Sequence, residues 1–300
     1  MSFAAQSEAI QQIGQLSNYC FNYDYVSSAL SRLYEFYSVS KSTKDSNLML
    51  LSGATGVGKT TIVNQFLRRV PGHSCDEEEM WDVIFLQVPA SCTPKALATE
   101  LLVSFGDPAA DKGTMPNMTR RVINYLNKLK VSLVILDEFQ HLIETKSERV
   151  LYATADWLKS VTNEVECSFL LVGLPSLADV IEANPQLKRR VVSRFEVNEF
   201  ALNSKDDLRR IQTILGLFSE KLPFENATVI ASEAFVRAIH SASGGMIGSM
   251  VNILKLASLN ALREEARYLA QHHFQDAAKE LDLGGNLSTA SSLTTFQRVL

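Results

Sequence analysis

LMLLSGATGVGKTT, residues 48–61, is the stretch that decides the fold of this 300-residue chain. An apolar run leads into Gly53 and, after four intervening residues, into Gly58-Lys59-Thr60, which fits the pattern G-x-x-x-x-G-K-[ST]. The glycines allow backbone conformations in which successive N–H groups point inward at a phosphate. A helix that begins near Lys59 adds the positive end of its dipole. The stretch therefore predicts a strand, a nucleotide-binding loop and a helix.

The residues of this loop have separate expected roles. Lys59 would reach the β and γ phosphates of ATP, and the Thr60 hydroxyl would ligate Mg²⁺. A chance glycine turn between a strand and a helix is the alternative, and the complete pattern with both flanking elements argues against it. The residues expected to contact ATP are Gly53, Ala54, Thr55, Gly56, Val57, Gly58, Lys59, Thr60 and Thr61.

The apolar run VSLVILDE, residues 131–138, is a second motif and ends in two acidic residues. Such a continuous run predicts a central parallel strand whose last residues lie at the catalytic edge of the sheet. Asp137 is expected to hold Mg²⁺, directly or through water. Glu138 is expected to orient and polarise the water that attacks the γ phosphate. An acidic helix cap is the alternative for an isolated pair, but the preceding phosphate loop favours the catalytic interpretation.

Composition and charge narrow the class of protein. The chain is 46% hydrophobic and 21% charged with a net charge of −4, which argues against a protein that coats nucleic acid through bulk positive charge. No apolar run approaches the ~20 residues that span a bilayer, and the first residues are too polar for a signal peptide. We therefore expect a cytoplasmic protein without a membrane partner.

Cysteines and histidines show no ligand spacing. The four cysteines form no C-x-x-C pair and are expected to be buried, reduced thiols: Cys20, Cys75, Cys92 and Cys167. The neighbouring His272 and His273 are expected to be solvated helix residues rather than metal ligands.

Alternating strand and helix patterns predict an α/β fold with a parallel-sheet sandwich and a C-terminal helical lid. After the strand that precedes the loop, further strands are expected at 83–88, 131–138, 167–173 and 195–202, and purely helical periodicity follows from about residue 204. The expected divisions are a helical segment at 1–46, a nucleotide-binding domain at 47–202, a lid at 203–282 and a flexible tail at 283–300.

Over about residues 25–280 the order of elements resembles the AAA+ ATPases, and it is most similar to the TniB/TnsC group of transposon target-selection regulators. The phrases that carry the resemblance are GATGVGKTT, LVILDEFQHL, SFLLVGLPSLADVIEANPQL, SRFEVNEFAL and SASGGMIGSMVNILKLA. The resemblance implies an AAA+ P-loop fold and an ATP-dependent homo-oligomer, a ring or a helical filament, that assembles on duplex DNA without sequence preference. It also implies recruitment of a transposase, contact with a target-selection adaptor protein, and disassembly driven by ATP hydrolysis.

The same resemblance places Arg194 of SRFE where such proteins carry the arginine that reaches a neighbouring subunit's ATP, with Arg190 and Arg189 as competing candidates. An ordinary salt-bridging arginine is the alternative. Two positions depart from the family pattern. Leu174 replaces a usual polar residue, which leaves γ-phosphate sensing to Ser176 or absent, and Ser249 stands where a sensor arginine is expected. We therefore expect slow hydrolysis that depends on assembly or on a partner.

Residues 112–136 contain five basic residues, each a lysine or an arginine, and no acidic residue. Lys112-Gly113-Thr114 resembles a K-G-T phrase that follows a DNA strand in some of these regulators, and both side chains suit phosphate contact without base reading. The expected DNA-binding residues are Lys112, Thr114, Arg120, Arg121 and, more weakly, Lys95. A solvated helix face is the alternative for the basic residues from 120 onward.

Two other functions remain open from the sequence. One is a helicase loader or remodeller of the AAA+ group, which would prefer single-stranded DNA or capture a helicase. The other is a signalling or scaffolding switch that binds nucleotide but not DNA, which the missing sensor arginine and the acidic composition favour.

Overall fold

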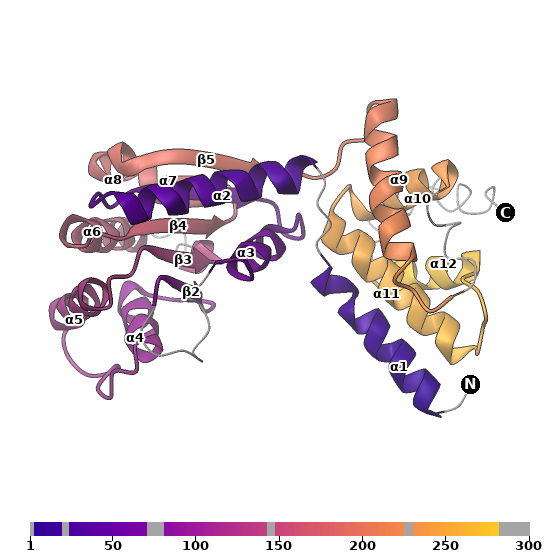
Figure 1. Cartoon of the computed structure of the whole chain (residues 1–300), viewed down its shortest axis with the longest axis horizontal. Helices are drawn as coiled ribbons and strands as arrows, with labels where there is room; N and C mark the ends of the chain where they lie inside the picture. The colour runs from indigo at the N-terminus through magenta and orange to yellow at the C-terminus, as the bar shows by residue number, and fades with distance from the viewer. Residues whose placement is uncertain are drawn as a thin grey trace. The chain divides into compact units, whose positions relative to one another are not determined.

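The computed structural model describes residues 3–19, 24–70, 81–142, 148–224, 230 and 232–281 (Figure 1). Contacts divide the chain into two compact units. The sheet unit comprises residues 27–55 and 59–197, and the helical unit comprises residues 1–26, 56–58 and 198–300. Each unit is described by itself.

The sheet unit contains a five-stranded parallel sheet in the order β2-β3-β4-β1-β5. Its strands are β1 (Leu48–Gly53), β2 (Val83–Gln87), β3 (Leu133–Asp137), β4 (Ser168–Gly173) and β5 (Val191–Val197). Ser52 pairs with Gly173, and Gln87 pairs with Asp137. The carboxyl ends of β1, β2, β3 and β4 therefore lie along one edge, where the expected nucleotide site is. The predicted parallel-sheet fold is confirmed.

Helices cover the sheet because its central strands are apolar on both sides. Every residue of β3 and β4 is buried, as expected for strands covered on both faces. Leu48 and Leu50 of β1 share a core with helices α4, α5 and α6, and the rings of Tyr34 and Tyr37 in α2 pack against Phe66 of α3. The helices of the unit are α2 (Asp24–Ser42), α3 (Lys59–Leu67), α4 (Pro94–Ser104), α5 (Met115–Lys128), α6 (Glu148–Glu164), α7 (Leu177–Glu182) and α8 (Pro185–Arg190), with the 3₁₀ helix η2 at Phe139–Leu142.

Local signals explain where α4 begins. Pro94 occupies its first turn, and the Thr93 hydroxyl accepts a hydrogen bond from the Ala96 N–H at 3.1 Å. A hydroxyl residue followed by proline is thus the local signal that begins this helix.

The last strand differs from the prediction. It was expected over residues 195–202, but β5 runs from Val191 to Val197. Exposure alternates along it with a period of two, as on an edge strand that packs on one side only. Arg194 therefore lies within a strand, not ahead of one.

The helical unit is organised around α11 (Ile247–Arg263), which contacts helices from both ends of the sequence. The other elements of this unit are α1 (Phe3–Gly14), the 3₁₀ helix η1 (Gln15–Asn18), α9 (Lys205–Ser219), α10 (Glu233–Ser243) and α12 (Gln271–Glu280). Ala9, Ile13 and Leu16 belong to the same apolar core as α11. The expected 1–46 segment is thus divided, with α1 in the helical unit and most of α2 in the sheet unit.

Among the described residues no single helix is long and apolar enough to cross a membrane, and the pair α10 and α11 reaches that length and composition only across a 111° bend. Of the predicted buried thiols, Cys92 and Cys167 are free and buried, whereas Cys20 and Cys75 lie outside the described residues. The predicted tail at 283–300 also lies outside them.

Candidate functional site

The loop after β1 holds a buried cation. Gly56 and Gly58 have φ angles of 84° and 99°, a region that glycine adopts far more readily than other residues. The Lys59 side chain is 6% exposed, and its ammonium donates to the carbonyl oxygens of Gly53 (2.9 Å) and Ala54 (2.8 Å). Burial lowers the pKa of Lys59, an effect that the nearby carboxylates of Glu138 and Asp137 oppose. An anion bound at this loop would favour the charged form of the lysine.

Asp137 faces this loop from the end of β3. One carboxylate oxygen accepts a hydrogen bond from the Thr60 hydroxyl at 2.7 Å, and the other accepts from the Glu138 N–H at 2.8 Å. The side chain is fully buried, and burial raises its pKa against the opposing effect of these two hydrogen bonds. A hydroxyl and a carboxylate are the hard oxygen ligands that Mg²⁺ prefers. The pair therefore fits a magnesium ion, which when bound would supply the positive charge that the buried carboxylate lacks.

Glu138 follows in a conformation that is uncommon for a residue with a side chain, with φ of 54°. Its carboxylate accepts a hydrogen bond from Nε2 of Gln140, and Oε1 of Gln140 accepts the Leu174 N–H at 3.1 Å. The half-buried carboxylate thus lies beside Asp137, where it can orient a water molecule and accept its proton. The sequence prediction had no role for Gln140.

For the turn after β4, the sequence left γ-phosphate sensing either to Ser176 or absent. Ser176 is exposed before α7, and its side chain makes no capping hydrogen bond. The polar side chain that the structure brings to this turn is Gln140. A sensing role for Ser176 stays a prediction.

The three arginine candidates differ in their surroundings. Arg190 donates to the carbonyl oxygen of Ser46 and to Oδ1 of Asn163, both at 2.8 Å, within the sheet unit. Arg194 is 47% exposed on β5 and has one ion pair, with Glu182 at 3.1 Å. Arg189 is exposed at the end of α8. Arg194 and Arg189 are therefore better placed than Arg190 to reach another molecule.

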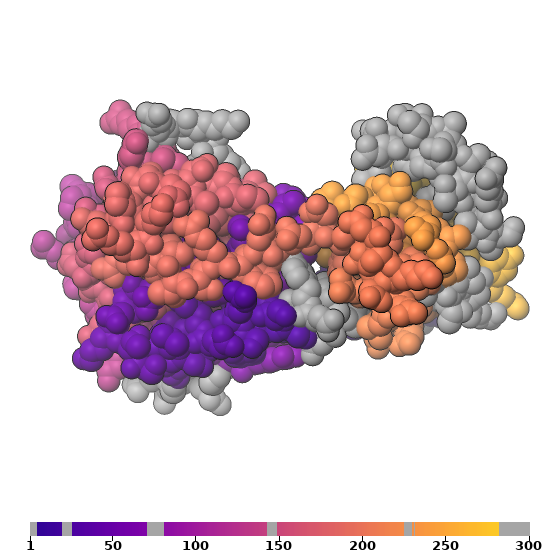
Figure 2. Space-filling view, turned by 90° about the horizontal axis from the view of Figure 1, so that it is seen from above, coloured from indigo at the N-terminus to yellow at the C-terminus, as the bar shows by residue number. Residues whose placement is uncertain are grey.

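A shallow groove of about 630 Å³ lies between α2 and β5, close to Arg194 in the sequence. Val39 and Val192 line it and are 46% and 57% exposed, and the Arg32 guanidinium lies over the Phe195 ring at 5.3 Å. Figure 2 shows the indigo residues of α2 beside the salmon residues of β5 on this face. The groove thus combines charged and apolar side chains.

The proposed DNA-binding residues fall into two groups. Lys112, Thr114, Arg120 and Lys95 are all exposed, and the Thr114 hydroxyl makes no capping hydrogen bond at the start of α5. Arg121 is different, because its Nε donates to Asp107 at 2.9 Å and its Nη1 donates to the Lys112 carbonyl oxygen at 3.0 Å. The structure therefore ties Arg121 to the 107–112 turn that carries Lys112.

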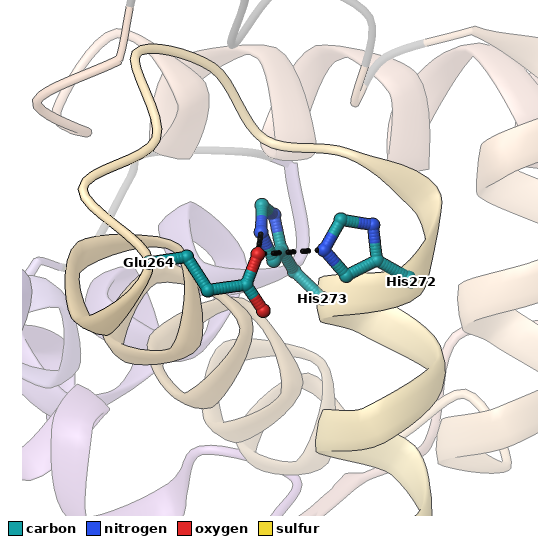
Figure 3. Close-up of side chains that lie close together, drawn as sticks. All are labelled: Glu264, His272 and His273. Atoms are coloured by element: carbon teal, nitrogen blue, oxygen red, sulfur yellow. Dashed lines mark hydrogen bonds and ion pairs between the residues drawn. The ribbon is translucent and has the colours of Figure 1, made fainter.

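A third cluster lies at the start of α12, where His272 and His273 both reach Glu264 (Figure 3). Their Nε2 atoms lie 2.9 and 3.1 Å from one Glu264 oxygen. His273 is 1% exposed, so the prediction of a solvated side chain is wrong for it and holds only for the exposed His272.

The hydrogen bonds of His273 define the character of this cluster. Nδ1 of His273 accepts the Ala270 N–H at 3.0 Å, so the ring proton is on Nε2 and is donated to Glu264. A histidine that binds metal through Nε2 normally donates from Nδ1 instead. The cluster therefore joins the end of α11 to the start of α12, and the two histidines lower the pKa of Glu264.

Comparisons with known proteins give a family for the chain and solved structures with a similar fold. Residues 14–201 match the family model described as Bacterial TniB protein. No sequence among curated proteins matches the chain.

Solved structures give the fold. The Aeropyrum pernix ORC2 protein in its ADPNP–ADP complexes is 18% identical, with a TM-score of 0.66 over 89% of this chain and 71% of that one. CDC6P from Pyrobaculum aerophilum is 14% identical, with a TM-score of 0.65 over 87% and 68%. The Aeropyrum pernix ORC1 protein in complex with DNA is 19% identical, with a TM-score of 0.62 over 86% and 67%. The fold is that of the AAA+ ATPases.

Proposed function

Since this chain belongs to the TniB family, we propose that it is an ATP-dependent regulator of transposition that assembles as an oligomer on duplex DNA. The assembled oligomer recruits a transposase and meets a target-selection adaptor, and ATP hydrolysis drives its disassembly. The observation that carries this proposal is the 2.7 Å hydrogen bond from the exposed Thr60 hydroxyl to the buried Asp137 carboxylate, close to the buried Lys59 ammonium.

Each residue of this site has a role in binding or hydrolysis. Lys59 and the backbone N–H groups of residues 53–61 bind the phosphates, and Thr60 and Asp137 hold Mg²⁺. Glu138 holds the attacking water and accepts its proton. The ion contributes positive charge that offsets the charge developing on the phosphates.

Assembly completes the site in this proposal. An arginine from the neighbouring subunit neutralises charge on the transferred phosphoryl group, so hydrolysis depends on oligomerisation. Exposure favours Arg194 over Arg190 for this role, because Arg190 already binds Ser46 and Asn163. Withdrawing Arg194 from Glu182 costs little, since both side chains are about half exposed and water screens their ion pair.

Contact with DNA runs through the phosphate backbone. Lys112, Thr114 and Arg120 are exposed and can contact phosphates, whereas Arg121 holds the turn that presents Lys112. Phosphate contacts fix position without reading sequence, so binding is independent of sequence. One of the solved structures with this fold, the Aeropyrum pernix ORC1 protein, is a complex with DNA.

Imaging with duplex DNA tests assembly. Rings or filaments are expected with ATP and Mg²⁺ and are expected to be absent with ADP or without nucleotide. Lys59→Ala should abolish them, and Glu138→Gln should leave them persistent because hydrolysis stops. Lys44→Ala, at a lysine that is 85% exposed, serves as the control and should assemble like wild type. Assembly of Lys59→Ala on DNA at wild-type levels would contradict the proposal.

Salt dependence tests the DNA surface. Lys112→Ala should weaken binding to all duplex sequences alike and reduce the slope of log K against log salt by about 1. Thr114→Ala should weaken binding without changing that slope, since no charge is removed. A preference for single-stranded DNA would indicate a helicase loader, and no binding to DNA at low salt would indicate a nucleotide-dependent switch.

A further inference from the structure

We propose that Gln140 is a positioning residue for Glu138 and that it couples the carboxylate to the turn after β4. This inference rests on the proposed ATPase function and adds to it a residue that the P-loop and the two acidic residues do not account for. Gln140 is the second residue of η2 and is 5% exposed, so its amide lies inside the sheet unit.

The amide of Gln140 is bonded at both ends, and chemistry fixes its orientation. Its Nε2 donates to the Glu138 carboxylate, and its Oε1 accepts the Leu174 N–H at 3.1 Å. The reverse orientation would set the amide oxygen against a carboxylate and the NH₂ group against an N–H, leaving a buried acceptor and a buried donor unpaired. Only one arrangement satisfies both neighbours, and it holds one Glu138 oxygen and leaves the other for water.

Gly173 is what allows this arrangement. A Cβ at position 173 would lie 2.4 Å from Oε1 of Gln140, well inside any real contact distance. The next nearest atoms to that Cβ are Gln140 N and a Leu177 methyl, both at 3.4 Å, which is ordinary contact. In its observed position the Gln140 side chain therefore occupies the space that a Cβ at position 173 would need.

Leu174 stands where the family pattern has a polar residue, and its backbone has a role in this site. The leucine side chain cannot bind a phosphate, but its backbone N–H holds the glutamine that holds Glu138. A movement of the turn at Gly173 and Leu174 would displace the Gln140 side chain and, with it, the Glu138 carboxylate. Glu138 has φ of 54°, and the glutamine limits the positions that its carboxylate can take.

Steady-state ATPase measurements on assembled protein with duplex DNA test the positioning role. Gln140→Leu should lower kcat about ten- to hundredfold while the KM for ATP stays within about twofold, because the carboxylate loses its orientation but the phosphate loop is intact. Gln140→Glu keeps an acceptor for the Leu174 N–H but cannot donate to Glu138, so it should lose as much kcat as Gln140→Leu. Gln186→Leu, at an exposed glutamine of α8, is the control and should match wild type.

A double-mutant cycle gives a second readout that does not depend on hydrolysis. Thermal unfolding without nucleotide should show a lowered Tm for Gly173→Ala, because the new Cβ meets Oε1 of Gln140. Gln140→Ala removes that oxygen, so adding Gly173→Ala to it should lower Tm no further. If Gly173→Ala lowered Tm by the same amount in wild type and in Gln140→Ala, the contact would not exist and the inference would be overturned.

The outcomes separate this inference from the proposed function. A wild-type protein without ATPase activity on DNA would overturn both. An active wild type whose kcat is unchanged in Gln140→Leu would overturn the inference alone. A Gln140→Leu protein with a raised KM and unchanged kcat would also overturn it, because that pattern belongs to nucleotide binding. Binding of a fluorescent ATP analogue with wild-type affinity, together with the lowered kcat, supports it.

Discussion

Two buried aspartates lie at opposite ends of the same sheet and are stabilised in opposite ways. Asp82 precedes β2 and is 6% exposed, and its carboxylate accepts hydrogen bonds from the Lys41 ammonium at 2.6 Å and from the hydroxyls of Tyr37 and Ser132. Asp137 ends β3 and is fully buried, and its hydrogen-bond donors are the Thr60 hydroxyl and the Glu138 N–H. Among the residues that the structure describes, only the first carboxylate hydrogen-bonds a cation.

The pKa values follow this difference. Burial opposes ionisation at both sites, but at Asp82 the hydrogen bonds from Lys41, Ser132 and Tyr37 outweigh it and lower the pKa. At Asp137 burial dominates and raises the pKa. A buried carboxylate with its cation in place joins parts of a fold, whereas one without it is poised for a cationic ligand. This difference supports a structural role for Asp82 and the proposed magnesium-binding role for Asp137.

The largest expected effect comes from Asp137→Asn. Because the amide cannot hold Mg²⁺ as the carboxylate does, DNA-stimulated ATP hydrolysis should fall about a hundredfold or more. Steady-state phosphate release measures this loss. Wild-type turnover in Asp137→Asn would show that the buried carboxylate is not a magnesium ligand.

The same variant should not be less stable. The raised pKa means that this carboxyl group lowers the free energy of unfolding as the pH rises from its unfolded pKa to its folded pKa, and asparagine removes the charge that causes this loss. The amide can still accept from Glu138 N–H and donate to the Thr60 hydroxyl oxygen. Urea unfolding without nucleotide or Mg²⁺ should therefore give a free energy of unfolding equal to or above that of wild type.

Asp82→Asn makes the matched change at the other site and should have the reverse result. It removes the negative charge that the Lys41 ammonium and the two hydroxyls stabilise, at a cost of about 2 kcal/mol in the free energy of unfolding. Nucleotide binding should be unchanged, since Asp82 lies at the opposite edge of the sheet. A loss of ATP affinity without a loss of stability would show that Asp82 acts in nucleotide binding and not in holding the fold together.

The pH dependence of the free energy of unfolding gives a further test of the role of Asp82. Because the folded pKa of Asp82 is lowered, its contribution is present above the ordinary aspartate pKa of about 3.9 and is lost as the pH falls through the folded value. Wild type should therefore lose more free energy of unfolding than Asp82→Asn between neutral pH and strong acid. Chemical denaturation at a series of pH values measures the difference, and parallel curves would contradict it.

Tyr37→Phe should have the smallest effect, about 1 kcal/mol in the free energy of unfolding. It removes one donor to Asp82 but keeps the ring that packs edge-on against Phe66. Burial and the hydrogen bond to Asp82 raise the pKa of Tyr37 to about 12, so the hydroxyl remains a donor well into the alkaline range. Spectrophotometric titration of the tyrosines, compared with Tyr37→Phe, checks that value.

The nucleotide end of the sheet could be predicted because its signals are local in sequence. Glycine spacing, a lysine and a hydroxyl in one loop, and two acidic residues after one apolar run each lie within a few positions. The strands β1 to β4 were predictable because continuous apolar runs mark buried parallel strands. The edge strand β5 was placed four residues late because its alternating exposure gives a weaker signal.

Contacts between distant residues could not be predicted in the same way. Gln140 acquires its role only because the turn at Gly173 and Leu174 folds next to it. Asp82 finds its partners at Lys41 and Ser132, each tens of residues away, and nothing in the sequence near Asp82 indicates either. Arg121 reads as one more basic residue until the structure pairs it with Asp107.

The packing of α1 against α11 has a consequence for the order of folding during synthesis. The sheet unit is complete once Val197 has been made, and domains generally fold as units as they emerge from the ribosome. Ile13 and Leu16 precede the sheet unit in the sequence, and their apolar partners on α11 follow it. The apolar face of α1 therefore lacks these partners while the sheet unit is synthesised, and exposed apolar surface of this kind is what chaperones bind and what promotes aggregation.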